Sequence, residues 1–186
     1  MFSEERVAQM AAYLLSKGGG RMAYLKLMKL LYLSDRESMR RFGETISGDR
    51  MVSMPHGPVL SQTLDLINGF IQGNPNGWDK WISDKESYDV SLKQNPVGRD
   101  DFDELSDDEL GILDGIHAEF GHMNKYEIRD YTHKNCTEWS DPHGGSHTIN
   151  AENVFIALGK SYSAARVLAD RLRDQQQLDE MVRSLI

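Results

Sequence analysis

The segment from about Met22 to Phe42 limits the possible folds more than any other part of the chain. Between Tyr24 and Leu33 its apolar side chains occur on most sides of a helix rather than along one stripe, which is typical of a helix that packs on several faces. Gly43 is a suitable terminator, because glycine readily takes the left-handed conformation that ends many helices. We therefore expect this segment to be the central helix of the protein.

Helices are also predicted on both sides of this segment. Before it, apolar residues recur at the spacing of an amphipathic helix, at Val7, Met10, Ala11, Leu14 and Leu15. Ser3 can cap the start of that helix, and Gly18–Gly20 can end it. After the central segment, a third helix is predicted from about Leu60 to Gln72, on the pattern Leu60, Leu64, Ile67 and Ile71.

Three helix starts further along the chain have readable caps. Ser106 with Glu109 and Asn124 with Glu127 each form a capping box, and Asn150 is a third cap candidate. These caps predict helices over about 107–120, 125–133 and 151–183. Gly159 lies inside the last span and is placed to break or bend it.

Strand signals are short and few. Weak extended segments flank a turn-like sequence within residues 44–55, and a small hairpin is predicted within 78–100, where Tyr88–Leu92 alternates in polarity and is separated from Val97 by a turn. The chain has 186 residues, which suits one well-buried core. We therefore expect a mainly α-helical single domain over residues 1–186, with about six helices and a small inserted β-hairpin.

Composition narrows the classes of function. The formal net charge is −8, from 29 acidic and 21 basic residues, which opposes approach to a phosphate backbone and disfavours direct nucleic-acid binding. A local exception is conceivable around the central helix, where basic residues gather at Arg21, Lys26, Lys29, Arg36, Arg40 and Arg41. One cysteine, no export signal at the start and no long apolar run together predict a cytoplasmic protein without a membrane anchor.

No reaction centre emerges from the residues. His133, Cys136, His143 and His147 could bind zinc chemically, but they lack the close ligand pairs that structural zinc sites use. A Cys136 thiolate with a histidine base would need an oxyanion hole, and the sequence supplies no sign of one. We expect no enzyme activity, no cofactor and no metal.

Three short strings occur in order along the chain: Lys29-Leu30-Leu31-Tyr32, Pro55-His56-Gly57-Pro58-Val59, and Thr132-His133 followed by Glu138-Trp139. Their order and spacing resemble the Panacea domain, which is typified by the SocA-like antitoxin of a type II toxin–antitoxin pair. The resemblance implies an antitoxin that binds a toxin protein directly, with the toxin encoded beside it. One member of this family also delivers its toxin to a Clp-type protease, which makes such a protease a second partner to consider.

The resemblance also singles out motif residues that are candidates for partner binding: Lys29, Tyr32, Asp35, His56, Gly57, Pro58, Thr132, His133 and Trp139. Each has a structural interpretation as well. Pro58 suits the first turn of the following helix, the Tyr32 hydroxyl and His133 are expected to be hydrogen-bonded, Asp35 to pair with a nearby arginine, and Trp139 to pin a loop to the core.

Two other classes of function stay open at this point. The first is a phage-associated or prophage-associated protein that modulates a host factor without a toxin partner, which the genes beside it would distinguish from an antitoxin. The second is an enzyme, which would need a pocket joining His56, His133 and Cys136.

Overall fold

The computed structural model describes residues 1–184. In that range the chain forms eight α-helices, one 3₁₀ helix and five short strands: α1 Glu4–Lys17, β1 Arg21–Ala23, α2 Tyr24–Phe42, β2 Met51–Met54, β3 Gly57–Leu60, α3 Ser61–Asn68, α4 Trp78–Trp81, β4 Asp89–Ser91, η1 Arg99–Phe102, α5 Asp107–Phe120, α6 Lys125–Asn135, β5 His147–Thr148, α7 Ala151–Ala157 and α8 Tyr162–Ser184. The predicted class, mainly α-helical with a small β insert, is confirmed.

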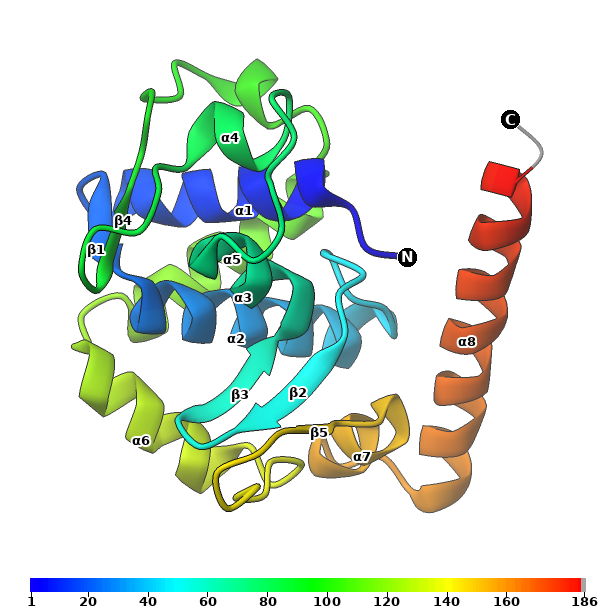
Figure 1. The fold of residues 1–186 in the computed structure, drawn as a ribbon. Coiled ribbons are helices and arrows are strands. Elements are labelled where there is room, and N and C mark those ends of the chain that lie inside the picture. The colour runs from blue at the N-terminus through cyan, green and yellow to red at the C-terminus, as the bar shows by residue number, and fades with distance from the viewer. Residues whose placement is uncertain (185–186) are drawn as a thin grey trace.

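Helix α2 is central, as expected. Figure 1 shows it running through the middle of the molecule, with α1 above it, α6 at the lower left and the β2–β3 hairpin crossing in front. Its side chains Leu27, Leu30 and Leu31 are fully buried, and Gly43 ends the helix in the left-handed conformation. Burial on several faces explains why this stretch is apolar on most of its sides.

The strands form two small antiparallel sheets. In one, β2 lies between β3 and β5, and in the other β1 pairs with β4. The second pairing corrects two predictions. Residues 21–23 form a strand rather than the first turn of α2, and Val90 pairs with Met22 rather than with Val97. The small hairpin predicted within 78–100 is present, because antiparallel bridges join Ile82 to Leu92 and Glu86 to Asp89.

Other boundaries differ from the prediction because of glycines. Gly69 takes a positive φ and ends α3 at Asn68, short of the expected Gln72. Gly159, with φ +85°, divides the predicted helix over 151–183 into α7 and α8. This division and the additional short helix α4 raise the number of α-helices above the expected six.

The predicted caps are present with one exception. Ser106 and Asn124 each form a capping box with the glutamate three residues later, and Ser3 accepts a hydrogen bond from the Arg6 amide. Asn150 occupies the N-cap position of α7, but its side chain makes no capping hydrogen bond.

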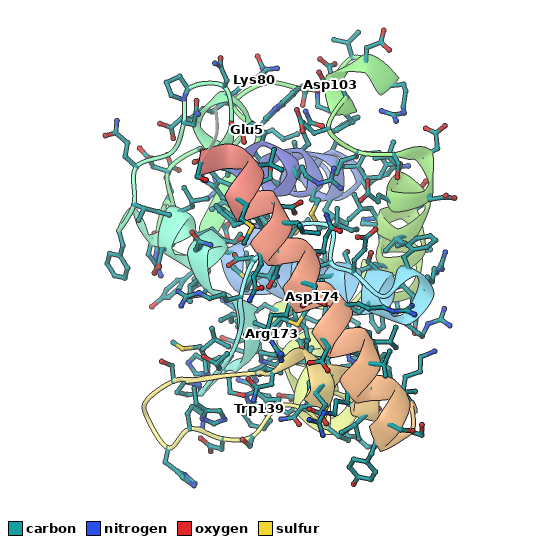
Figure 2. The ribbon with its side chains drawn as sticks, turned by 90° about the vertical axis from the view of Figure 1, so that its right-hand side faces the viewer. Glu5, Lys80, Asp103, Trp139, Arg173 and Asp174 are labelled. Carbon is teal, nitrogen blue, oxygen red and sulfur yellow. The ribbon has the colours of Figure 1, made fainter. Side chains whose placement is uncertain are left out.

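Helix α8 lies along one side of the molecule. It is at the right in Figure 1, and Figure 2 looks onto it, with Arg173 and Asp174 near its middle. Ala165 and Ala169 are buried on its inner side, whereas Val167 and Leu178 are more than half exposed on its outer side. No helix among the described residues is long and apolar enough to cross a membrane.

Candidate functional site

The nine motif residues come from four segments that meet around the β2–β3 hairpin. Helix α2 supplies Lys29, Tyr32 and Asp35, the hairpin supplies His56, Gly57 and Pro58, helix α6 supplies Thr132 and His133, and the segment after α6 supplies Trp139. We call this region the hairpin junction. It joins residues more than 100 positions apart in the sequence.

Lys29 ties the hairpin to the central helix. Its Nζ donates a hydrogen bond of 2.7 Å to the carbonyl oxygen of Pro58, and the lysine is fully buried. Burial lowers the pKa of Lys29 to about 7, because the ammonium loses its hydration. The side chain therefore serves as an internal donor that holds β3 against α2.

Gly57 allows helix α6 to approach the same point of the hairpin. Its φ is +93°, and a Cβ placed there would lie 2.9 Å from Thr132 Oγ1, 3.0 Å from Lys29 Nζ and 3.1 Å from His133 Cδ2. Both the backbone conformation and the space exclude a larger residue without rearrangement. Glycine is thus required for the hairpin, α2 and α6 to meet.

Pro58 lies in strand β3 and not in the first turn of a helix, which corrects the prediction. Strand β3 is an edge strand, since it pairs only with β2 in the order β3-β2-β5. An edge strand tolerates a residue without an amide proton. Helix α3 begins three residues later, at Ser61.

A buried carboxylate, Glu138, links α2 to the segment after α6. It accepts hydrogen bonds of 2.7 Å from the Tyr32 hydroxyl and 2.7 Å from Arg36 Nε, and its side chain is fully buried. The predicted hydrogen bond of Tyr32 is confirmed. Burial and then the Glu138 charge raise the pKa of Tyr32 well above its ordinary value, so the phenol stays a donor.

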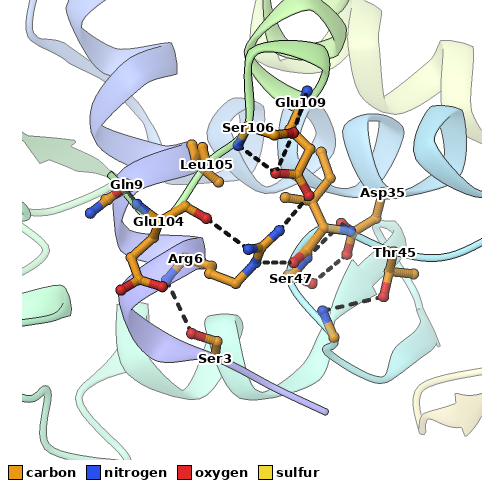
Figure 3. Close-up of polar contacts among 12 residues, drawn as sticks. Ser3, Arg6, Gln9, Asp35, Thr45, Ser47, Glu104, Leu105, Ser106 and Glu109 are labelled. Carbon is orange, nitrogen blue, oxygen red and sulfur yellow. Dashed lines mark hydrogen bonds and ion pairs between the residues drawn. The ribbon is translucent and has the colours of Figure 1, made fainter. Parts of the chain in front are cut away.

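Asp35 does not pair with an arginine, contrary to the prediction. Its Oδ1 accepts the backbone amides of Ile46 and Ser47 at 2.9 and 3.0 Å, and its other oxygen accepts the Ser47 hydroxyl. Figure 3 shows these contacts next to Arg6, which holds the same loop through the Ile46 carbonyl. Burial raises the pKa of Asp35 to about 6.

Trp139 and His133 cover the outer side of the junction. Their rings stack with centroids 4.1 Å apart, and Trp139 Nε1 donates to the Met54 carbonyl at 2.9 Å. Trp139 thus pins its loop to the hairpin, although it is only partly buried. The prediction of a hydrogen bond for His133 is wrong, because its buried Nε2 has no partner among the described residues.

Most of the motif residues are out of reach of a partner. Lys29, Tyr32, Asp35 and Thr132 have no exposed surface, and Gly57 and Pro58 are buried as well. His56, at the tip of the hairpin, is exposed, whereas His133 and Trp139 are half-buried. In this geometry most of the motif residues pack inside the protein, and only His56, His133 and Trp139 keep exposed surface.

The chemistry of Cys136 disfavours a nucleophile at this place. The residue is 1% exposed, and burial raises the pKa of its thiol to about 12, so that almost no thiolate forms at neutral pH. Within residues 1–184, no three His, Cys, Asp or Glu side chains gather closely enough to hold a metal ion.

Sequence reasoning missed two residues of the junction. The sequence analysis named Arg36 only as part of a basic cluster and Glu138 only as a motif residue beside Trp139. In the structure these two residues form the buried ion pair of the hairpin junction. The sequence carries no local signal for this pair, because its two residues are 102 positions apart.

A family profile described as "Antitoxin SocA-like, Panacea domain" matches residues 27–140, from the central helix to the segment that carries Trp139. No curated protein and no solved structure matches the chain. The matched range contains all nine motif residues and the whole hairpin junction. The chain therefore belongs to the SocA-like Panacea-domain antitoxin family.

Proposed function

We propose that this protein is an antitoxin that neutralises a toxin protein, encoded by a neighbouring reading frame, by binding it directly. The observation that carries the proposal is the match to the antitoxin family over residues 27–140. The binding would mask the active or target-binding surface of the toxin. Because the motif residues are mostly buried, specificity would come from the exposed side chains around the hairpin junction.

The distribution of charge favours a protein partner over a nucleic acid. The basic residues around α2 do not form one free face: Lys29 is buried, Arg36 pairs with Glu138, and Arg40 and Arg41 both pair with Glu37. With a net charge of −8, little remains to attract a phosphate backbone.

The proposal includes no catalytic step. The one cysteine of the chain is buried with a raised thiol pKa, which removes the most reactive nucleophile from the surface. A buried cysteine with no partner for a disulfide also suits action in the cytoplasm.

Co-expression tests the proposal. The neighbouring reading frame would be induced with this protein or with a version carrying an early stop codon, and growth and co-purification would be measured together. We expect the neighbour to arrest growth alone and the intact protein to restore growth and form a stable complex. A harmless neighbour, or rescue without a complex, would overturn neutralisation by direct binding.

Delivery of the toxin to a Clp-type protease is a separate part of the proposal, taken from the family resemblance. It predicts that the toxin half-life, followed by pulse-chase labelling, falls when this protein is present and recovers when the protease is deleted. An unchanged half-life would exclude the adaptor activity and leave direct neutralisation standing.

A further inference from the structure

A second group of exposed and half-buried residues lies beside the hairpin junction, around a pocket of about 300 Å³. We call it the tyrosine pocket and define it by six of its residues: Tyr24, His56, Tyr88, Lys125, Tyr126 and Arg129. Its residues come from the start of α2, the tip of the β2–β3 hairpin, the loop before β4 and the first turns of α6.

The fold builds this pocket from distant parts of the chain. The Tyr24 amide, at the start of α2, donates to the Tyr88 carbonyl at 2.8 Å, which places the loop before β4 against α2. On the other side, the Asn124 capping box fixes the first turn of α6 and with it Lys125 and Tyr126. His56 reaches the pocket from the hairpin and connects it to the motif residues.

Cations stand over the aromatic rings of the pocket. Lys125 Nζ lies 5.3 Å from the ring centre of Tyr88 and 5.2 Å from that of Tyr126, and the Arg129 guanidinium lies 5.4 Å from the Tyr126 ring. Lys85, at the edge, lies 4.9 Å from the Tyr24 ring. These distances are within the range of cation–π attraction.

Two of these cations lack an acidic partner. Among the side chains that the structure describes, no carboxylate forms an ion pair with Lys85 or Lys125, whereas Arg129 pairs with the exposed Asp130. Elsewhere, basic residues such as Arg21, Arg36 and Arg99 have carboxylate partners. Lys125 thus brings an unpaired positive charge to the tyrosine pocket of a protein whose net charge is −8.

The side chains of the pocket are of the kind that anchors protein interfaces. Tyr88 is 65% exposed and Tyr126 55% exposed, and tyrosine and arginine are enriched among the residues that contribute most to binding. A volume of about 300 Å³ accommodates a side chain or two, not a folded element.

We propose that the tyrosine pocket docks an acidic segment of the toxin, with a carboxylate placed on Lys125 and a neighbouring apolar side chain packed on Tyr88 and Tyr126. This inference rests on the proposed function and adds the site and the chemistry of the contact. Charge complementarity selects the occupant, because the unpaired Lys125 beside the exposed rings of Tyr88 and Tyr126 favours an anionic and partly apolar partner.

Single-stranded nucleic acid fits the pocket less well. Bases bind such surfaces by stacking on open aromatic faces along a positively charged groove. A pocket of about 300 Å³ is not an extended groove, and the net charge of −8 opposes the approach of a phosphate chain.

A labelled peptide tests the chemistry of the pocket independently of any toxin. The probe would alternate Asp or Glu with Leu or Phe. Its controls would be the same peptide with every carboxylate replaced by an amide, and an oligo-dT of 12 nucleotides. By fluorescence anisotropy at low salt, we expect the acidic peptide to bind at least about tenfold more tightly than the amide peptide.

Charge reversal locates the binding. The double variant Lys125→Glu and Arg129→Glu should weaken the acidic peptide at least about tenfold, and a glutamate at position 125, the first of α6, suits the helix dipole. Lys160→Glu, an exposed control between α7 and α8, should change the affinity less than about twofold. Circular dichroism and thermal unfolding would verify each fold.

Each outcome decides something. Equal binding of the acidic and amide peptides, or unchanged binding by the double variant, overturns the proposed pocket, and tighter binding of oligo-dT would assign it to nucleic acid. If the double variant loses the peptide but still restores growth against the toxin, the toxin docks elsewhere and the proposed function stands. If the wild-type protein fails to restore growth, the proposed function fails while the peptide result still judges the pocket.

Discussion

The hairpin junction and helix α8 contain the same kind of ion pair, but the pair is buried in the junction and exposed on α8. Each contains an Arg–carboxylate pair of similar length, 2.7 Å for Arg36–Glu138 and 2.9 Å for Arg173–Asp170. In the junction the carboxylate is fully buried, whereas on α8 both side chains are at least half exposed. The junction contains a crowded glycine with positive φ, Gly57, and the turn before α8 contains another, Gly159, with no neighbour within 4 Å of an added Cβ.

This difference indicates which residues the stability of the fold depends on and which positions tolerate substitution. A buried ion pair depends on both partners, and a crowded glycine has no substitute, so the junction constrains the residues that build it. Helix α8 lies outside the range that matches the family, residues 27–140, and its outer side imposes few such constraints. The part of the chain that matches the family is therefore the part whose side chains pack to form the hairpin junction.

Loss of the junction carboxylate should have the largest effect. Glu138→Ala leaves Arg36 and the Tyr32 hydroxyl without their acceptor and should lower the free energy of unfolding by about 4 kcal/mol. Asp170→Ala, the matched change on α8, should cost less than about 0.5 kcal/mol. Urea denaturation of both variants measures the difference, and equal costs would remove the distinction between the two regions.

The two glycines give the next largest contrast. Gly57→Ala combines an unfavourable φ with contacts near 3 Å to Thr132 and Lys29, and should cost about 3 kcal/mol. Gly159→Ala carries the unfavourable φ without the contacts and should cost about 1 kcal/mol. The same denaturation experiment separates conformational cost from crowding, and a Gly57 variant no worse than the Gly159 variant would show that α6 can move away.

The buried lysine predicts a dependence of stability on pH. Since the pKa of Lys29 falls from its ordinary value near 10.5 to about 7 on folding, the unfolded chain binds more protons than the folded protein above pH 7. Stability should therefore rise from pH 7 to 9, by up to about 1 kcal/mol per pH unit.

Lys29→Met provides the control, because it removes the titrating group from the same site. The pKa of Asp35, about 6, makes stability depend on pH mainly below pH 7. The raised pKa of Cys136 makes stability fall only above about pH 9. A rise of equal slope in the methionine variant would assign the effect to another group.

The smallest effect is expected on the outer side of α8. Leu178 is 56% exposed, so Leu178→Gln should change the free energy of unfolding by less than about 0.5 kcal/mol. Leu168 packs partly against the core, and Leu168→Gln should cost about 1 to 2 kcal/mol. Thermal unfolding of the two variants tests whether α8 has an inner and an outer side, and equal losses would contradict it.

The sequence predicted the elements that depend on neighbouring residues. The apolar pattern around Leu30 marked the central helix, the Ser106 and Asn124 capping boxes marked α5 and α6, and Gly159 marked the end of α7. In each case the interaction that decides the structure lies within one or two helical turns.

What escaped prediction depends on contacts between distant segments. The pairing of Arg21 with Ser91 and the bond from Tyr32 to Glu138 bring together residues that share no local pattern. An arginine was predicted as the partner of Asp35 because a sequence shows which side chains are charged. It does not show which backbone amides will face a carboxylate, and Asp35 accepts hydrogen bonds from the amides of Ile46 and Ser47. The buried state of the motif residues followed from the same distant packing.

The contacts of Asp35 have a consequence for the motion of the loop after α2. The amides of Ile46 and Ser47 lie in an irregular segment, where hydrogen exchange with solvent is usually fast. Here both protons point at a carboxylate that is itself fully buried, so they can exchange only when the junction opens. In a deuterium-exchange experiment this loop should therefore behave as part of the central helix, and its slow amides would report the opening of the whole core.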